Sequence, residues 1–86
     1  MPTISRFFGL VISMYHDDHA PPHFHVKYAE YRGRITIGGL ELIEGNLPRR
    51  ALALVLEWAA VHRSDLWTNW HRAGAGLPLE QIAPLD

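Results

Sequence analysis

Two neighbouring segments of the chain alternate strictly between polar and apolar residues, which is the pattern of a β-strand with one buried face. They are residues 23–28 and 31–37, and only Ala29 and Glu30 separate them. Pairing them as a hairpin about Ala29 and Glu30 sorts the side chains, because successive side chains of a strand point to opposite faces. The apolar face then collects Phe24, Val26, Tyr28, Tyr31, Gly33 and Ile35, and the polar face collects His23, His25, Lys27, Arg32, Arg34 and Thr36. A shift of one residue would destroy this sorting, so the pattern predicts the register of the hairpin as well as its strands.

The residues on either side of this hairpin also favour strands. Residues 4–15 are rich in Ile, Val, Phe and Tyr and predict one or two strands, with Gly9 at a bulge or a close backbone approach. Their poor alternation indicates a central strand or one buried on both faces. Gly38 and Gly39 predict a turn, and residues 40–44 a short further strand. We therefore expect an antiparallel sheet of three to four strands in the strand-rich part, residues 1–44.

Helix-forming residues dominate the next part of the chain, residues 46–74. Asn46 is a candidate N-cap and Pro48 suits a first helical turn, so a helix is expected over residues 47–62. Its apolar residues form two stripes, which indicates burial against more than one partner. The first stripe is Leu52, Val55, Leu56 and Ala59, and the second is Leu54, Trp58 and Val61. Ser64 is expected to cap a second helix that runs to about Ala73, with Gly74 just beyond its end.

The dimensions of these helices bear on the whole domain. One straight helix over residues 47–73 would be roughly 40 Å long at 1.5 Å per residue, so we expect a break near Ser64 or a dimer. Residues 75–86 predict an extended tail that returns to the sheet or the helices. Strands followed by helices indicate a single α+β domain over residues 1–86, in which the N-terminal sheet packs against the C-terminal helices.

Composition limits the classes of function. The 86 residues contain no cysteine, which excludes disulfides and thiolate metal sites and fits a reducing cytoplasm. The apolar run at residues 7–14 is too short to span a bilayer, so no membrane association is expected. The formal net charge is −1, so binding of nucleic acid would require cations clustered on one surface.

Four of the six histidines lie within residues 16–25, together with two aspartates and the pair Pro21–Pro22. Imidazole and carboxylate groups bind divalent metals, and the metal hypothesis draws its ligands from this segment. The candidate ligands are His16, Asp18 and His19, with Asp17, His23 and His25 as further ligands in the same segment. The spacing matches no recognised metal signature, so we expect no obligatory cofactor and keep a divalent metal as the alternative. The alternative, which we favour, is a polar turn whose side chains cap backbone groups or make other contacts without a metal.

The polar face of the predicted hairpin suggests chemistry on RNA. Arginine binds phosphate through two hydrogen bonds, and histidine can exchange protons near neutral pH. Cleavage of RNA without metal needs such an acid, a base and cations. The candidate catalytic residues are His23 and His25, and the candidate substrate-binding residues are Lys27, Arg32 and Arg34. The alternative is a solvated face whose cations pair with Glu30, Glu41 or Glu44.

Several segments, in this order and at this length, resemble a known family of small bacterial proteins. They are residues 1–9 (MPTISRFFG), residues 18–26 (DHAPPHFHV), residues 47–52 (LPRRAL) and Glu57-Trp58. The chain is similar over nearly its whole length to domain of unknown function family 4160, and the Pro-Pro-His-Phe-His-Val motif is specific. The family has no established activity. Its members often look like one half of a two-gene cassette that resembles a toxin–antitoxin module.

The resemblance implies a toxin-like component with a cassette partner protein, and the RNA hypothesis gives such a component an activity. The competing hypothesis is a non-catalytic, partner-binding or regulatory module. For that module, or for a homodimer, Trp58, Trp67 and Trp70 would supply apolar surface, whereas the favoured alternative places these tryptophans in the ordinary core. The sequence leaves open whether the protein is an enzyme.

Overall fold

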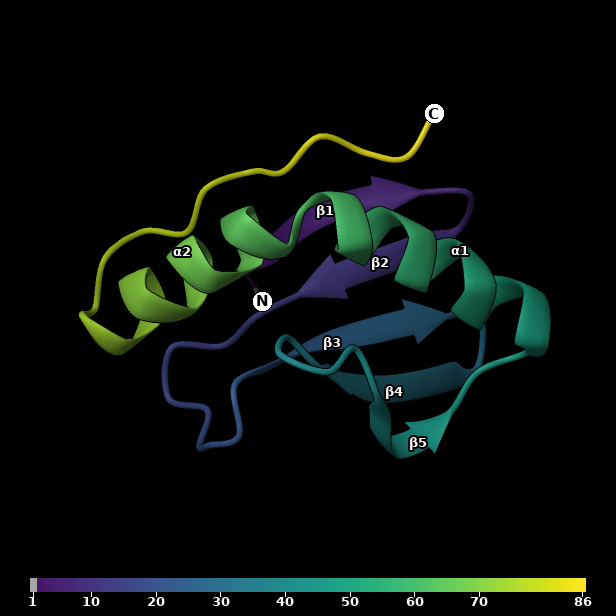
Figure 1. Ribbon diagram of the computed structural model, residues 1–86, viewed down its shortest axis with the longest axis horizontal. Coiled ribbons are helices and arrows are strands. Elements are labelled where there is room, and N and C mark those ends of the chain that lie inside the picture. Colours follow the sequence, from purple (N-terminus) through teal and green to yellow (C-terminus); the bar gives the residue numbers. More distant parts are fainter. Residues whose placement is uncertain (1) are drawn as a thin grey trace.

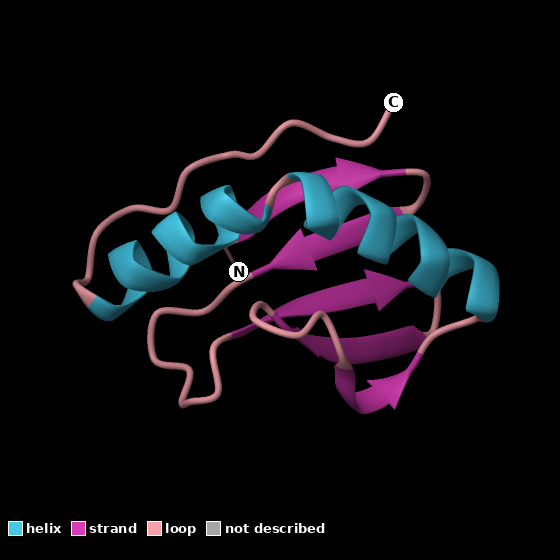
Figure 2. Ribbon diagram, viewed as in Figure 1, coloured by secondary structure: helices cyan, strands magenta, loops and turns pink. Residues whose placement is uncertain are grey.

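The computed structural model describes residues 2–86 and confirms the α+β architecture, with one strand more than expected (Figures 1 and 2). The strands are β1 (Thr3–Phe7), β2 (Leu10–Ser13), β3 (His23–Tyr28), β4 (Tyr31–Thr36) and β5 (Leu42–Asn46), and the helices are α1 (Arg49–Val61) and α2 (Arg63–Gly74). The five strands form one sheet in chain order, and each strand is antiparallel to its neighbours. Connections between neighbouring strands therefore need only short turns, apart from the longer segment between β2 and β3.

The register predicted for the hairpin of β3 and β4 is confirmed. Tyr28 lies opposite Tyr31, His25 opposite Arg34, and Phe24 opposite Ile35. Two residues, Ala29 and Glu30, make the turn. Ala29 takes a left-handed backbone conformation with φ of 52°, which is the conformation a tight two-residue hairpin requires even without glycine.

Residues 4–15 form a second hairpin. Phe8 and Gly9 make its turn with φ values of 49° and 81°, so Gly9 serves a tight turn rather than a bulge. The strand predicted to be central is thus two strands, of which β2 is internal and β1 is at the end of the sheet. The tail covers the edge of β1, because Ile82 donates a backbone hydrogen bond of 2.8 Å to the carbonyl of Ile4.

The two helices lie across one face of the sheet (Figure 2). The predicted apolar face of β3 and β4 is buried beneath them, together with side chains from β1 and β2. The fully buried core includes Ile4, Ile12, Phe24, Ile35, Val55, Trp58 and Leu66. The opposite face of the sheet, called the open face below, carries the polar residues of the alternation. Binding chemistry on the sheet must therefore use the open face.

The predicted starts of both helices are wrong by two residues. Asn46 is the last residue of β5 and pairs with Arg32, so it does not cap α1. Pro48 occupies the N-cap position of α1, where no side chain caps the helix. The break between the helices falls at His62, so Ser64 lies inside α2, and Gly74 is the last residue of α2 rather than the residue beyond it.

The break at His62 divides what would otherwise be one long helix, as expected from the size of the domain. The longest extent of the molecule is 33 Å, and two helices joined at His62 fit within it. Only part of the second predicted stripe of α1 is buried. Trp58 has no exposed surface, whereas 73% of Val61, the last residue of α1, is exposed.

The C-terminal tail returns to the sheet and the helices, as expected. The indole Nε1 of Trp58 donates a 2.8 Å hydrogen bond to the carbonyl of Ala83. The buried side chain of Asn69 donates to the carbonyl of Glu80 and accepts from its backbone N–H, at 2.9 and 2.8 Å. These bonds fix the tail against both helices. No helix within residues 2–86 is long and apolar enough to cross a membrane.

Candidate functional site

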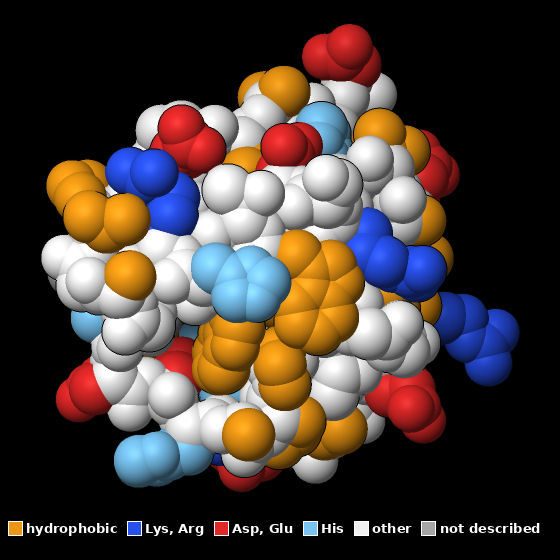
Figure 3. All heavy atoms as spheres, turned by 60° about the vertical axis from the view of Figure 1, so that its left-hand side comes forward, with side chains coloured by type: hydrophobic (Ala, Val, Ile, Leu, Met, Phe, Trp, Pro, Cys, Tyr) orange, Lys and Arg blue, Asp and Glu red, His pale blue; other side chains and the backbone are white. Residues whose placement is uncertain are grey.

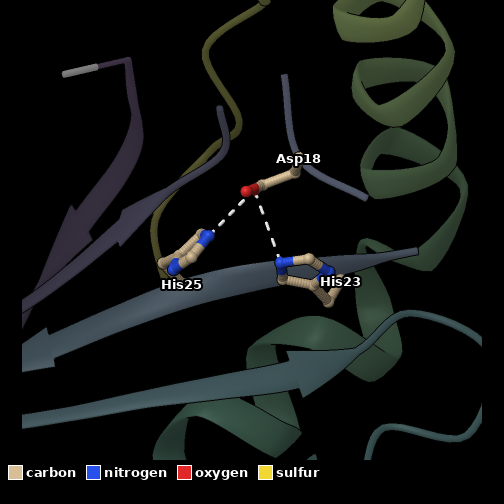
Figure 4. A group of neighbouring side chains, drawn as sticks. All are labelled: Asp18, His23 and His25. Carbon is tan, nitrogen blue, oxygen red and sulfur yellow. Dashed lines mark hydrogen bonds and ion pairs between the residues drawn. The ribbon is translucent and has the colours of Figure 1, made fainter. Parts of the chain in front are cut away.

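The segment between β2 and β3 folds back so that Asp18 faces the two histidines of β3 (Figure 4). His23 and His25 are two residues apart on one strand, so their side chains leave the same face. The Nε2 atom of His25 donates a 2.8 Å hydrogen bond to Oδ2 of Asp18. The Nε2 atom of His23 lies 3.4 Å from the same oxygen. The three residues therefore make one cluster, which is called the Asp-His-His cluster below.

His23 is the buried member of this cluster, with 2% of its surface exposed. Its Nδ1 atom donates a 2.7 Å hydrogen bond to the carbonyl of Pro21. Trp70 of α2 packs against the ring, with 5.6 Å between the ring centroids. The alternation placed His23 on the correct face, but at this end of β3 Trp70 of α2 and residues Pro21 and Asp18 of the β2–β3 segment pack around its ring. His23 therefore lies under other residues instead of facing solvent with Lys27 and Arg32.

His25 is half-buried and borders the open face. Its ring makes a T-shaped contact with the ring of Tyr15, with 4.5 Å between centroids and an angle of 84° between the planes. It lines two adjacent hollows of about 70 and 160 Å³, and Arg32 lines both of them as well. Of the two candidate catalytic histidines, His25 is the one that small molecules or a nucleic acid on the open face could contact.

Cations form a row across the open face. The pairing of the strands places Arg6 opposite Val11, Val11 opposite Lys27, and Lys27 opposite Arg32. Partners in an antiparallel pair share a face, so the three cations point to the same side. Arg6, Lys27 and Arg32 are exposed, and none of them forms an ion pair with a carboxylate of residues 2–86.

Arg34 lies in the neighbouring row and is the candidate whose charge is partly compensated. Its Nε atom lies 3.5 Å from Glu44 across the pair of β4 and β5. Of the three glutamates that the sequence offered as partners, Glu44 is the one that pairs with a cation of this face. Arg6 was missed by the sequence reasoning. Its only signal in the sequence is a polar residue within β1. To place it beside Lys27, one must know how β1, β2 and β3 pair.

Of the proposed metal ligands, His23 and His25 join Asp18, whereas His16, Asp17 and His19 do not. His16 donates a 2.9 Å hydrogen bond from Nε2 to the carbonyl of Leu77, so it ties the β2–β3 segment to the tail. His19 is exposed, although it follows Asp18 in the sequence. Within residues 2–86, one group of three side chains brings its potential metal-ligating atoms close together. Its members are Asp18, His23 and His25.

The three tryptophans divide between the core and the surface. Trp58 is fully buried, whereas Trp67 and Trp70 are half-buried on α2. Trp67 stacks on His71, with 6.2 Å between centroids and an angle of 26° between the planes. The end of the molecule that α2 occupies carries a cluster of hydrophobic side chains beside a histidine (Figure 3). Some apolar surface thus remains after the core is formed.

Comparison with known protein families identifies one family, and its match includes the Asp-His-His cluster. A family model described as domain of unknown function (DUF4160) matches residues 9–71. The chain belongs to this family. The matched part of the DUF4160 chain holds the Asp-His-His cluster together with Lys27, Arg32 and Arg34, whereas Arg6 precedes it. No curated protein and no solved structure matches the chain.

Proposed function

We propose that this DUF4160 protein binds single-stranded RNA through the open face of its sheet, as the toxin-like component of a two-gene cassette. The observation that supports the proposal is the row of Arg6, Lys27 and Arg32. These three exposed cations form no ion pair within residues 2–86, and they share one face of a chain whose formal net charge is −1. Local clustering of this kind supplies attraction for a polyanion that the net charge does not.

The spacing of the row suits a chain of phosphates. Neighbouring strands lie about 4.8 Å apart, so the row from β1 to β4 covers roughly 14 Å. Two of its members are arginines, whose guanidinium groups bind a phosphate with two hydrogen bonds. Tyr15 and His25 lie beside the row and offer ring surfaces on which an unpaired base can stack. Sheet surfaces with cations and rings bind single strands, because unpaired bases can turn toward the protein.

The burial of His23 changes the role proposed for the histidines. Cleavage of RNA without metal needs an acid and a base that both contact the substrate. His23 directs both ring nitrogens into the protein, toward Pro21 and Asp18, and 2% of its surface is exposed. We therefore propose binding as the function of the open face, with His25 as the histidine that contacts the bound RNA.

Fluorescence anisotropy of a labelled, short single-stranded RNA tests the proposal. We expect Lys27→Ala and Arg32→Ala each to weaken binding about fivefold, which corresponds to about 1 kcal/mol for one charged contact. The matched control is Arg63→Ala, which removes an exposed arginine at the start of α2, remote from the row. Equal affinity of all four proteins would contradict the proposal, as would an equal loss in the control.

The apolar surface of α2 favours one alternative function, a module that binds its cassette partner protein. Trp67 and Trp70 are half-buried, and Val61 and Leu77 are exposed nearby in the sequence. Tryptophan contributes strongly to protein interfaces. Under this alternative, the purified protein does not bind RNA, and Trp67→Ala abolishes co-purification with the partner. Lys27→Ala would leave co-purification unchanged.

A further inference from the structure

We propose that the Asp-His-His cluster is a binding site for a divalent transition-metal ion, with Asp18, His23 and His25 as its three protein ligands. This inference does not depend on RNA binding. One nitrogen or carboxylate oxygen from each residue lies within 4.8 Å of the other two. Two imidazoles and one carboxylate are a ligand set for Zn²⁺ and for Fe²⁺.

The buried nitrogen of His23 is the observation that points to an ion. Because Nδ1 donates to the carbonyl of Pro21, the neutral ring carries a lone pair on Nε2. That lone pair lies 3.4 Å from Oδ2 of Asp18, and Nε2 is buried without a hydrogen-bond partner among residues 2–86. A lone pair and a carboxylate oxygen repel each other in such a setting, and an unsatisfied buried nitrogen is costly. A cation between the two atoms removes both penalties.

The hydrogen bond from His23 to Pro21 is also the arrangement that metal-binding histidines use. Such a histidine donates its second ring nitrogen to a carbonyl or carboxylate, which fixes the ring and directs the other nitrogen at the ion. The rings are held further by packing, His23 against Trp70 and His25 against Tyr15. Figure 4 shows Asp18 directed at both rings from the facing segment.

The distances need a small adjustment to hold an ion. With metal–ligand bonds of about 2.0–2.1 Å, tetrahedral ligand atoms lie roughly 3.3–3.4 Å apart. The pair of His23 and Asp18 already has 3.4 Å, whereas the hydrogen-bonded pair of His25 and Asp18 has 2.8 Å and must open. Binding at Nε2 of His25 requires its proton to move to Nδ1. Three protein ligands leave a fourth position for water or for a ligand that approaches over the open face.

The test uses the full chain without a histidine tag, stripped with a chelator and titrated with zinc or cobalt(II). We expect one ion per chain in calorimetry, and cobalt(II) absorption of a site with nitrogen and oxygen ligands. Asp18→Asn should raise the Kd for zinc at least tenfold, and so should His25→Gln. Both variants retain side chains of similar size, so they are more informative than His23→Ala, which would open a cavity in a buried position.

His19→Ala is the matched control, because His19 is exposed and adjacent to Asp18 in the sequence. It should bind zinc with the affinity of the unchanged protein. Zinc should also raise the Tm of the unchanged protein and not that of Asp18→Asn, since an ion that binds only the folded state stabilises it. Absence of binding would overturn the inference. Unchanged affinity in Asp18→Asn, or an equal loss in His19→Ala, would overturn it as well.

Discussion

The salt dependence of RNA binding should report the number of cations in the row. Each phosphate that a protein cation neutralises on a single strand contributes about −0.7 to the slope of log K against log salt. Arg6, Lys27 and Arg32 are the cations of the open face without an ion pair among residues 2–86, so the expected slope is about −2.1 for three phosphates. Affinity should then fall about 18-fold between roughly 50 and 200 mM salt.

Removal of one cation should reduce this slope by a definite amount. Lys27→Ala leaves two cations in the row, so the slope should be about −1.4 and the loss over the same salt range about 7-fold. Arg63→Ala should retain the full slope, since Arg63 is on α2. The measurement is a series of anisotropy titrations at stepped salt concentrations. A slope near zero, or the same slope for Lys27→Ala and the unchanged protein, would refute the assignment of phosphate contacts to this row.

Two further predictions concern the framework that holds the open face, and urea unfolding measures both. Gly45→Ala should lower the free energy of unfolding by about 3 kcal/mol or more, because Gly45 has φ of 84° and an added Cβ would collide with the carbonyl oxygen of Arg32. Gly76→Ala is the control and should cost about 1 kcal/mol, because Gly76 has φ of 73° but its added Cβ would meet no other residue within 4 Å. Equal losses in the two variants would contradict this reasoning. Asn69→Ala should cost about 2 kcal/mol by removing both hydrogen bonds to Glu80, and a cost below about 0.5 kcal/mol would show that the tail does not depend on them.

Structural features that follow from the pattern of residues within one short segment were predictable from the sequence. The alternation in residues 23–36 predicted both the register of β3 with β4 and the face of each side chain. This was possible because side chains alternate between a buried and an exposed face along each strand, so a shifted register would bury the polar residues. The extended tail was also predictable, since its prolines exclude a helix. By contrast, Asn46 has the chemistry of an N-cap but pairs with Arg32 as the end of β5, because pairing across the sheet outweighed its local preference.

The site itself depends on contacts between distant residues. Asp18 meets His23 and His25 only because the β2–β3 segment folds back onto β3, so the sequence offered His16 and His19 as equal candidates. Burial of His23 under Trp70 requires the position of α2 relative to the sheet, about which hairpin alternation carries no information. Likewise, Arg6 joins the row only because β1 pairs with β2 and β2 with β3. The sequence of β1 alone does not indicate these pairings.

Side-chain NMR signals of the labelled protein, recorded during titration with single-stranded RNA, distinguish binding on the open face from binding elsewhere. The arginine Nε–H groups and the histidine rings report contacts on each surface separately. If RNA binds the open face, the signals of Arg6, Arg32 and His25 should shift in proportion to the bound fraction, while those of Arg63 and His71 on α2 should not. Shifts confined to Arg63 and His71, or no shifts at RNA concentrations that saturate the anisotropy signal, would contradict it.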